Sequence, residues 1–124
     1  NLRLTSQETY TASSVLLSSG DTIEWKIVLR NTGKETAINL SITDTAPFDS
    51  SIFEPVVFVA MDTQFTGANP VDSWTYTADP AYINWEPWFS MPVSGAEDVK
   101  GLRWFVNVLG PKGIRSVRFR VRVK

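Results

Sequence analysis

Strict alternation of apolar and basic residues near the C-terminus is the feature that most constrains the fold. From Val117 to Lys124 every second side chain is apolar and each one between is Arg or Lys. Side chains repeat with a period of two along a β-strand and of 3.6 along an α-helix. The stretch therefore predicts a strand with one buried and one solvated face. Residues 22–30 alternate in the same way, with Val28 as the only break, and would turn one apolar face inward: Ile23, Trp25, Ile27 and Leu29.

Five further stretches also predict strands, and no stretch repeats convincingly with the period of a helix. They are residues 1–4, 37–43, 56–61, 73–77 and 101–109. Within residues 37–43 the alternation turns Ile38, Leu40 and Ile42 inward. Seven or more short strands in a chain of this length predict an all-β fold, built as a two-sheet antiparallel sandwich.

The link NTGKET, residues 31–36, joins two of these strands and is interpreted as a hairpin turn. Asn31 and Gly33 are residue types that tolerate the positive φ angles of tight turns. We therefore expect the strands on either side of this link to pair with each other.

Composition excludes several classes of protein. A chain of 124 residues with 43% hydrophobic content suits one domain, residues 1–124, with a single core. The net charge of -1 offers no overall positive field for nucleic acid, and no stretch approaches the roughly 18 apolar residues of a membrane span. The first residue is Asn1 and no basic and apolar leader follows it, so we expect a processed, secreted chain.

The residue types in the chain do not favour a catalytic site or a metal site. The chain contains neither His nor Cys, which removes the usual nucleophile and base arrangements and the typical zinc ligands. A glycosidase-like carboxylate pair could come only from scattered acids: Asp62, Asp72, Asp79 and Glu86. Calcium could be held by loop carboxylates, but no spacing resembles a calcium loop among Asp44, Asp49 and Asp72. We expect no enzyme activity, no metal and no cofactor.

The middle of the chain is rich in aromatic residues, and two interpretations are open. In the first, a platform stacks sugar rings and is formed by Trp74, Tyr76, Trp85 and Trp88. In the second, two or three of the aromatic residues between positions 74 and 89 fill the core and cover the open end of the sandwich. Prolines at positions 80, 87 and 92 favour such a folded-back lid. Trp25 and Trp104 alternate with the apolar face and are expected in the core.

Charge is unevenly distributed along the chain. Residues 35–98 hold ten acids and no Lys or Arg, whereas residues 100–124 hold eight basic residues and no acid. Such asymmetry indicates an interaction surface, or else the protection of an edge strand by basic side chains. In the first case a basic ladder would dock on the acidic segment of another copy, and we expect self-association through Arg118, Arg120, Arg122 and Lys124.

Four stretches of the chain follow one another in a recognisable order: GDTIEWKI, LRNTG, AINLSITDTAP and LRWFVNVLGPKGIRSVRFRVRV. This order of motifs resembles a known repeat, the domain of unknown function 11 of bacterial and archaeal surface proteins. It covers essentially the whole chain, except that Trp25 stands where the family usually has tyrosine and residues 48–101 are longer and richer in aromatics.

The resemblance implies an immunoglobulin-like β-sandwich of about seven to nine strands, extracellular or at the cell surface, and non-enzymatic. We expect a self-assembling subunit of a surface fibre or layer. Its partners would be copies of itself, joined head to tail or by strand addition, or neighbouring surface domains. The alternative is a carbohydrate-binding or adhesive module that uses the aromatic-rich middle segment to bind glycans. An Asn-Leu-Ser acceptor pattern at Asn39 is read as an unmodified strand residue.

Overall fold

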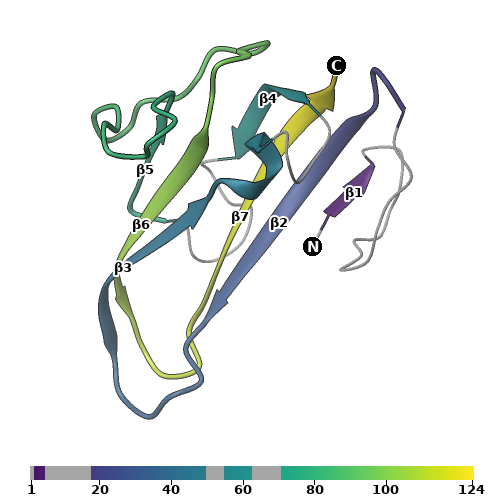
Figure 1. Ribbon diagram of the computed structural model, residues 1–124. Helices are drawn as coiled ribbons and strands as arrows, with labels where there is room; N and C mark the ends of the chain where they lie inside the picture. The colour runs from purple at the N-terminus through teal and green to yellow at the C-terminus, as the bar shows by residue number, and fades with distance from the viewer. Residues whose placement is uncertain (1, 5–17, 50–54, 63–70) are drawn as a thin grey trace.

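The structure, a computed structural model, describes residues 2–4, 18–49, 55–62 and 71–124 (Figure 1). Each of the seven stretches predicted as a strand forms one. The strands are β1 (Leu2–Leu4), β2 (Thr22–Arg30), β3 (Ala37–Asp44), β4 (Val56–Asp62), β5 (Ser73–Thr77), β6 (Gly101–Leu109) and β7 (Ile114–Val123). A short 3-10 helix, η1, covers Ala46–Phe48. No helix in the described ranges has the length and apolar character needed to cross a membrane.

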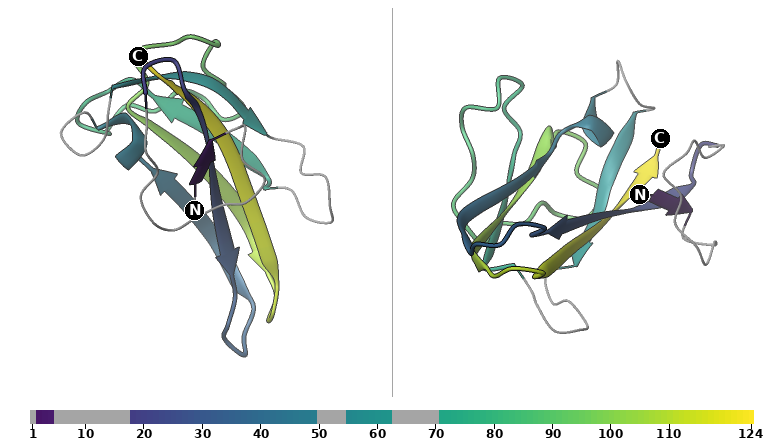
Figure 2. Two further views of the ribbon diagram at one scale, coloured as in Figure 1. Left: turned by 90° about the vertical axis from the view of Figure 1, so that its right-hand side faces the viewer. Right: turned by 90° about the horizontal axis from the view of Figure 1, so that it is seen from below.

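The strands form two antiparallel sheets, which confirms the predicted sandwich. One sheet has the order β1-β2-β7-β4 and the other the order β3-β6-β5, and Figure 2 shows the two layers from the side and from below. The long strands β2 and β7 pair from Thr22 opposite Arg122 to Arg30 opposite Ile114. Their inward side chains meet those of β6 across the layers, and this interface is the core.

Phe119 of β7 is the centre of an aromatic cluster in this core. It is 1% exposed, and its ring centroid lies 5.8 Å from that of Trp104, 6.1 Å from Phe48 and 6.4 Å from Trp25. Trp104 is fully buried and Trp25 is half-buried against the same cluster. The sequence prediction that both tryptophans belong to the core is confirmed. A proline-containing turn, η1, places Phe48 over the cluster.

The link between β2 and β3 is a corner between the two sheets, and the hairpin prediction was wrong. β2 pairs with β1 and β7, whereas β3 pairs with β6. Among the described residues, neither Asn31 nor Gly33 has a positive φ. The Asn-Thr-Gly signal is local, and it does not distinguish a hairpin from a turn that passes to the facing sheet.

Asn31 stabilises the β2–β3 corner through hydrogen bonds and not through a positive φ angle. Its Nδ2 donates to the carbonyl oxygens of Glu35 at 2.8 Å and Leu109 at 2.9 Å, and its Oδ1 accepts from the Gly33 amide at 2.9 Å. Its backbone amide donates to the Gly113 carbonyl at 3.0 Å, and its carbonyl accepts from the Lys112 amide at 2.9 Å. Asn31 therefore fastens the β2–β3 corner to the β6–β7 corner.

β3 departs from the predicted alternation at one position. Leu40 and Ile42 pack on the core as predicted, but Ile38 is 63% exposed. Asn39 has a φ of 53°, a left-handed conformation that shifts the side-chain phase of the strand at that point. Val108, opposite Ile38 on β6, is exposed as well.

β7 is a central strand and not an edge. It is paired with β2 on one side and with β4 on the other. Its inward residues Val117, Phe119, Val121 and Val123 are buried, as the alternation predicts. Protection of an edge strand therefore does not explain its basic outer face.

Candidate binding surfaces

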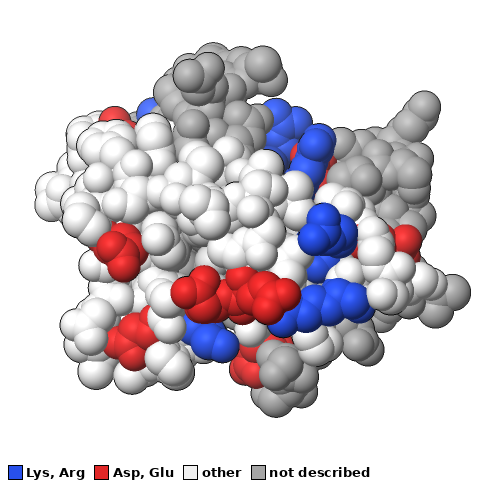
Figure 3. Space-filling view, turned by 90° about the horizontal axis from the view of Figure 1, so that it is seen from above, with Lys and Arg blue, Asp and Glu red and all other residues white. Residues whose placement is uncertain are grey.

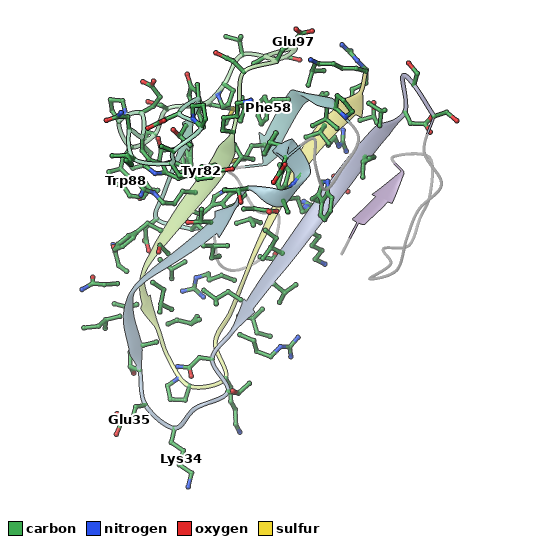
Figure 4. All side chains as sticks on the ribbon, in the orientation of Figure 1. Lys34, Glu35, Phe58, Tyr82, Trp88 and Glu97 are labelled. Carbon is green, nitrogen blue, oxygen red and sulfur yellow. The ribbon has the colours of Figure 1, made fainter. Side chains whose placement is uncertain are left out.

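The segment between β5 and β6 folds back along the edge of β5. The Glu86 amide donates to the Tyr76 carbonyl at 3.0 Å, and the Phe89 amide donates to the Trp74 carbonyl at 2.7 Å. Figure 4 shows Tyr82 and Trp88 of this segment beside β5. The segment is folded back, as the prolines suggested, and it covers the edge that β5 would otherwise present to solvent.

Two threonines of β5 anchor this segment to the outer face of the sheet. The Thr75 hydroxyl donates to the carbonyl oxygen of Glu86 at 2.6 Å, and the Thr77 hydroxyl donates to that of Asn84. Both threonines are fully buried although they point away from the core. Polar side chains on an outward face can be buried in this way because the segment above supplies their acceptors.

Asp79 shapes the first turn of the segment. Its carboxylate accepts hydrogen bonds from the backbone amides of Ala81 at 2.9 Å, Asn84 at 2.9 Å and Ile83 at 3.1 Å. The bond from Ala81, followed by that from Asn84, lowers the pKa of Asp79 below its ordinary value of 3.8. Asp79 was one of the acids considered for a catalytic pair. In the structure its carboxylate instead fixes the backbone of the turn over residues 81–84.

The four residues of the predicted glycan platform lie on two faces of one sheet. Trp74 and Tyr76 pack on the core from β5. Trp85 and Trp88 lie on the outer face, beside the outward residues of β6. The structure therefore brings Trp85 and Trp88 together and separates them from the other two.

Trp85 and Trp88 both contact the guanidinium group of Arg103. The guanidinium carbon lies 4.3 Å from the centroid of Trp85 and 4.9 Å from that of Trp88. Arg103 follows Leu102 and precedes Trp104, which are both fully buried and inward, so its side chain leaves the sheet on the opposite side. Cation–π contacts of this kind favour a guanidinium stacked on an indole face.

The neighbours of Arg103 along β6 make room for the two indoles. A Cβ at Gly101 would lie 3.3 Å from the Trp85 ring and 3.1 Å from the Thr45 methyl group, so the absence of a side chain lets Trp85 approach the strand. The Trp88 ring packs against Phe105 with centroids 5.8 Å apart. We name Trp85, Arg103 and Trp88 the Arg103 stack.

The sequence did not predict the Arg103 stack. One half of the stack could have been found from the spacing Gly-x-Arg-x-Phe of residues 101–105. This spacing puts a small, a basic and an aromatic residue on the same face of a strand. The partner sequence Trp-x-x-Trp, residues 85–88, is far from it along the chain. Only the fold brings the two patterns together.

The basic ladder predicted for self-association lies on the outer face of β7, where part of its charge is already paired. Arg120 Nε is 3.2 Å from Glu24 Oε1, and Glu24 is 4% exposed. Lys124 Nζ is 3.7 Å from Glu97 Oε2, with both side chains largely in solvent. Arg122 is exposed and Arg118 is half-buried. Figure 3 shows acidic and basic side chains next to each other at this end of the molecule, so the charge asymmetry of the sequence is smaller in space.

The edge of β3 has no hydrogen-bonded neighbour within the described part of the chain. β4 is covered at Phe58, which exchanges hydrogen bonds with Gly95 at 2.7 Å and Ala96 at 2.9 Å, and β5 is covered by residues 86–89. Among the described strands, β3 has only β6 beside it. Residues 37–43 of β3 carry no charged side chain and no proline.

The remaining acids are dispersed. Burial raises the pKa of Asp44 at the end of β3, and a hydrogen bond from the Ala46 amide opposes part of that shift. Asp72 Oδ2 accepts from the Asn107 amide at 2.6 Å. Over the described ranges, no three His, Cys, Asp or Glu residues come together in a group that could hold a metal ion. No protein family model, curated protein or solved structure matches the chain.

Proposed function

We propose that the domain is a non-enzymatic structural module of a prokaryotic cell surface that associates with copies of itself into a fibre or layer. The resemblance of its motifs to the domain of unknown function 11 supports an extracellular, immunoglobulin-like module. Constant-type immunoglobulin domains place the fifth strand between the second and the fourth. Here β7 has that position and β5 lies beside β6. The immunoglobulin-like sandwich that we propose therefore has a variant strand order.

The open edge of β3 is the observation that carries the proposal. Sheet edges present unpaired backbone groups, and proteins usually protect them with Lys, Pro, bulges or covering segments. In this chain a connecting segment covers β4 and β5. Residues 37–43 of β3 have neither a charge nor a proline, and Asn39 is their one irregularity. An extended partner strand could therefore add to the sheet through main-chain hydrogen bonds.

A second copy of this chain is the partner that we propose for β3. Two β3 strands can pair antiparallel about a twofold axis, which joins the two three-stranded sheets into one continuous sheet. A fibre or layer needs a second contact, which we assign to the outer face of β7. Because Arg120 and Lys124 already have acidic partners in the same chain, the ladder would set orientation while β3 supplies affinity.

Sedimentation of edge variants tests the proposal. The double variant Ile38→Lys with Ser41→Lys puts two charges on exposed positions of β3, and the control Asn107→Lys with Val108→Lys puts the same charges on exposed positions of β6. We expect concentration-dependent association of the wild type and the control, and monomers of the edge variant. A wild type that is monomeric at high concentration, or an edge variant that associates equally well, would contradict the proposal.

A glycan platform formed by the four predicted aromatic residues gains no comparable support. Trp74 and Tyr76 face the core. One face of Trp85 and one of Trp88 lie against Arg103, and Trp88 also packs on Phe105. A flat platform of four rings is not formed.

A further inference from the structure

The guanidinium of Arg103 is held by cation–π contacts with two indole rings. Its central carbon lies 4.3 Å from the Trp85 ring centroid and 4.9 Å from that of Trp88. Neither ring is loosely placed, because the Trp85 Nε1 donates to the Tyr82 carbonyl at 3.0 Å and Trp88 packs on Phe105. These cation–π contacts do not use the N–H donors of the guanidinium, which lie in its plane.

The donors of Arg103 have no acceptor within the described residues. A guanidinium carries five N–H donors in a planar fork. The Nε of Arg103 is buried without a hydrogen-bond partner among the described residues. Buried donors without partners are uncommon in native proteins and call for an explanation.

The segment around the stack is fixed before any ligand arrives. The Thr75 hydroxyl donates to the Glu86 carbonyl at 2.6 Å and to the Pro87 carbonyl at 3.2 Å, which holds the two residues between the tryptophans against the sheet. The hydrogen bonds accepted by Asp79 fix the turn that precedes Trp85. A preorganised site loses little conformational entropy on binding.

We propose that the Arg103 stack binds the carboxylate group of an acidic sugar. A carboxylate matches the planar fork of an arginine and accepts two parallel hydrogen bonds from it. The described residues give Arg103 aromatic contacts but no acceptor for its donors, so an oxyanion is the ligand that the geometry leaves. Trp88 itself and Tyr82, whose carbonyl is bonded to Trp85, are each 42% exposed and offer apolar surface to the sugar ring. This inference does not depend on self-association through β3.

Titration calorimetry at low salt with three probes tests the site. The probes are an oligogalacturonate, a neutral oligogalactose of the same length and a capped oligoglutamate peptide. Arg103→Lys keeps the charge but removes the fork, and Arg122→Lys, on the outer face of β7, is the matched control. We expect the oligogalacturonate to bind the wild type and Arg122→Lys equally, and Arg103→Lys at least tenfold more weakly. The neutral sugar should not bind.

Three outcomes would overturn the proposal: no binding of the oligogalacturonate, equal binding to Arg103→Lys, or tighter binding of the peptide than of the sugar. Circular dichroism establishes that each variant is folded. If Arg103→Lys does not fold, Trp88→Leu decides the question, because it retains Arg103 and removes one of its two cation–π contacts. Binding to Trp88→Leu should weaken at least threefold, and unchanged binding would exclude the site.

Discussion

Replacing Asn31 with glycine separates two explanations of the Asn-Thr-Gly corner. If the corner needed a positive φ at this position, glycine would be tolerated or would stabilise the fold. The structure instead shows a side chain that makes three hydrogen bonds, one partly buried and two exposed. At roughly 1 kcal/mol for the partly buried bond and 0.5 for each exposed one, the lost interactions amount to about 2 kcal/mol.

Urea unfolding followed by tryptophan fluorescence measures this loss. Glycine also adds backbone entropy to the unfolded chain, which costs about 0.5 to 1 kcal/mol, and the variant Thr32→Gly measures that contribution at an exposed neighbour. After this correction Asn31→Gly should remain about 2 kcal/mol less stable than the wild type, or about 8 °C lower in Tm for a domain of this size. Asn31→Asp keeps the acceptor for Gly33 but loses both donated bonds, and it should also be destabilised. A corrected loss below about 0.5 kcal/mol would refute the role assigned to the side chain.

Three further predictions concern the core, a close approach and two carboxylates. Phe119→Ala should lower the free energy of unfolding by about 3 to 5 kcal/mol, because it removes the centre of the aromatic cluster, and a loss under 1 kcal/mol in chemical denaturation would place Phe119 outside the core. Gly113→Ala should destabilise the β6–β7 corner, since a Cβ there would lie 2.6 Å from the Leu109 Cδ1 and 2.8 Å from the Gly110 carbonyl oxygen; an unchanged Tm would contradict this packing. The stability that Asp79 contributes through its lowered pKa is present above pH 3.8 and is lost as pH falls below it, so the deficit of Asp79→Asn should shrink in acid. Asp44 should change the free energy of unfolding in the opposite direction, because its raised pKa makes ionisation destabilise the fold above pH 3.8. The stability of Asp44→Asn should therefore increase relative to that of the wild type as pH rises. Stability curves of variant and wild type that run parallel with pH would contradict either assignment.

Strand positions could be predicted because alternation is a direct consequence of strand geometry. It was clearest in β2 and β7, whose outward positions carry charged residues that mark the solvent face. The prediction was wrong at Ile38, where Asn39 adopts a left-handed conformation that no propensity requires at that position. Pairing between strands was also wrong at the β2–β3 link, since a turn signal gives the location of a reversal but not the sheet to which the next strand returns.

Residues that come together from distant segments could be anticipated only in part. The fold-back of the segment after β5 followed from its prolines. The contact between Trp85, Trp88 and Arg103 depends on the register of β5 on β6 and on how that segment lies over both strands. Long-range register of this kind is set by the whole core and not by any local pattern.

Because β7 is a central strand, the chain can be divided into two pieces, residues 1–113 and 114–124, that we expect to fold only together. β7 alone joins β2 to β4 within the four-stranded sheet, although it is the last of the described strands along the chain. A chain that ends at Gly113 would leave the apolar faces of β2 and β4 without the strand between them, and we expect it to remain unfolded by circular dichroism. A peptide spanning residues 114–124 should restore the fold when added in trans, because it supplies the missing backbone partners and the aromatic centre of the core together. A truncated chain that folds by itself would show that the fold does not require β7. If the peptide restores the fold, the two pieces form a split domain whose assembly reports the binding of one strand.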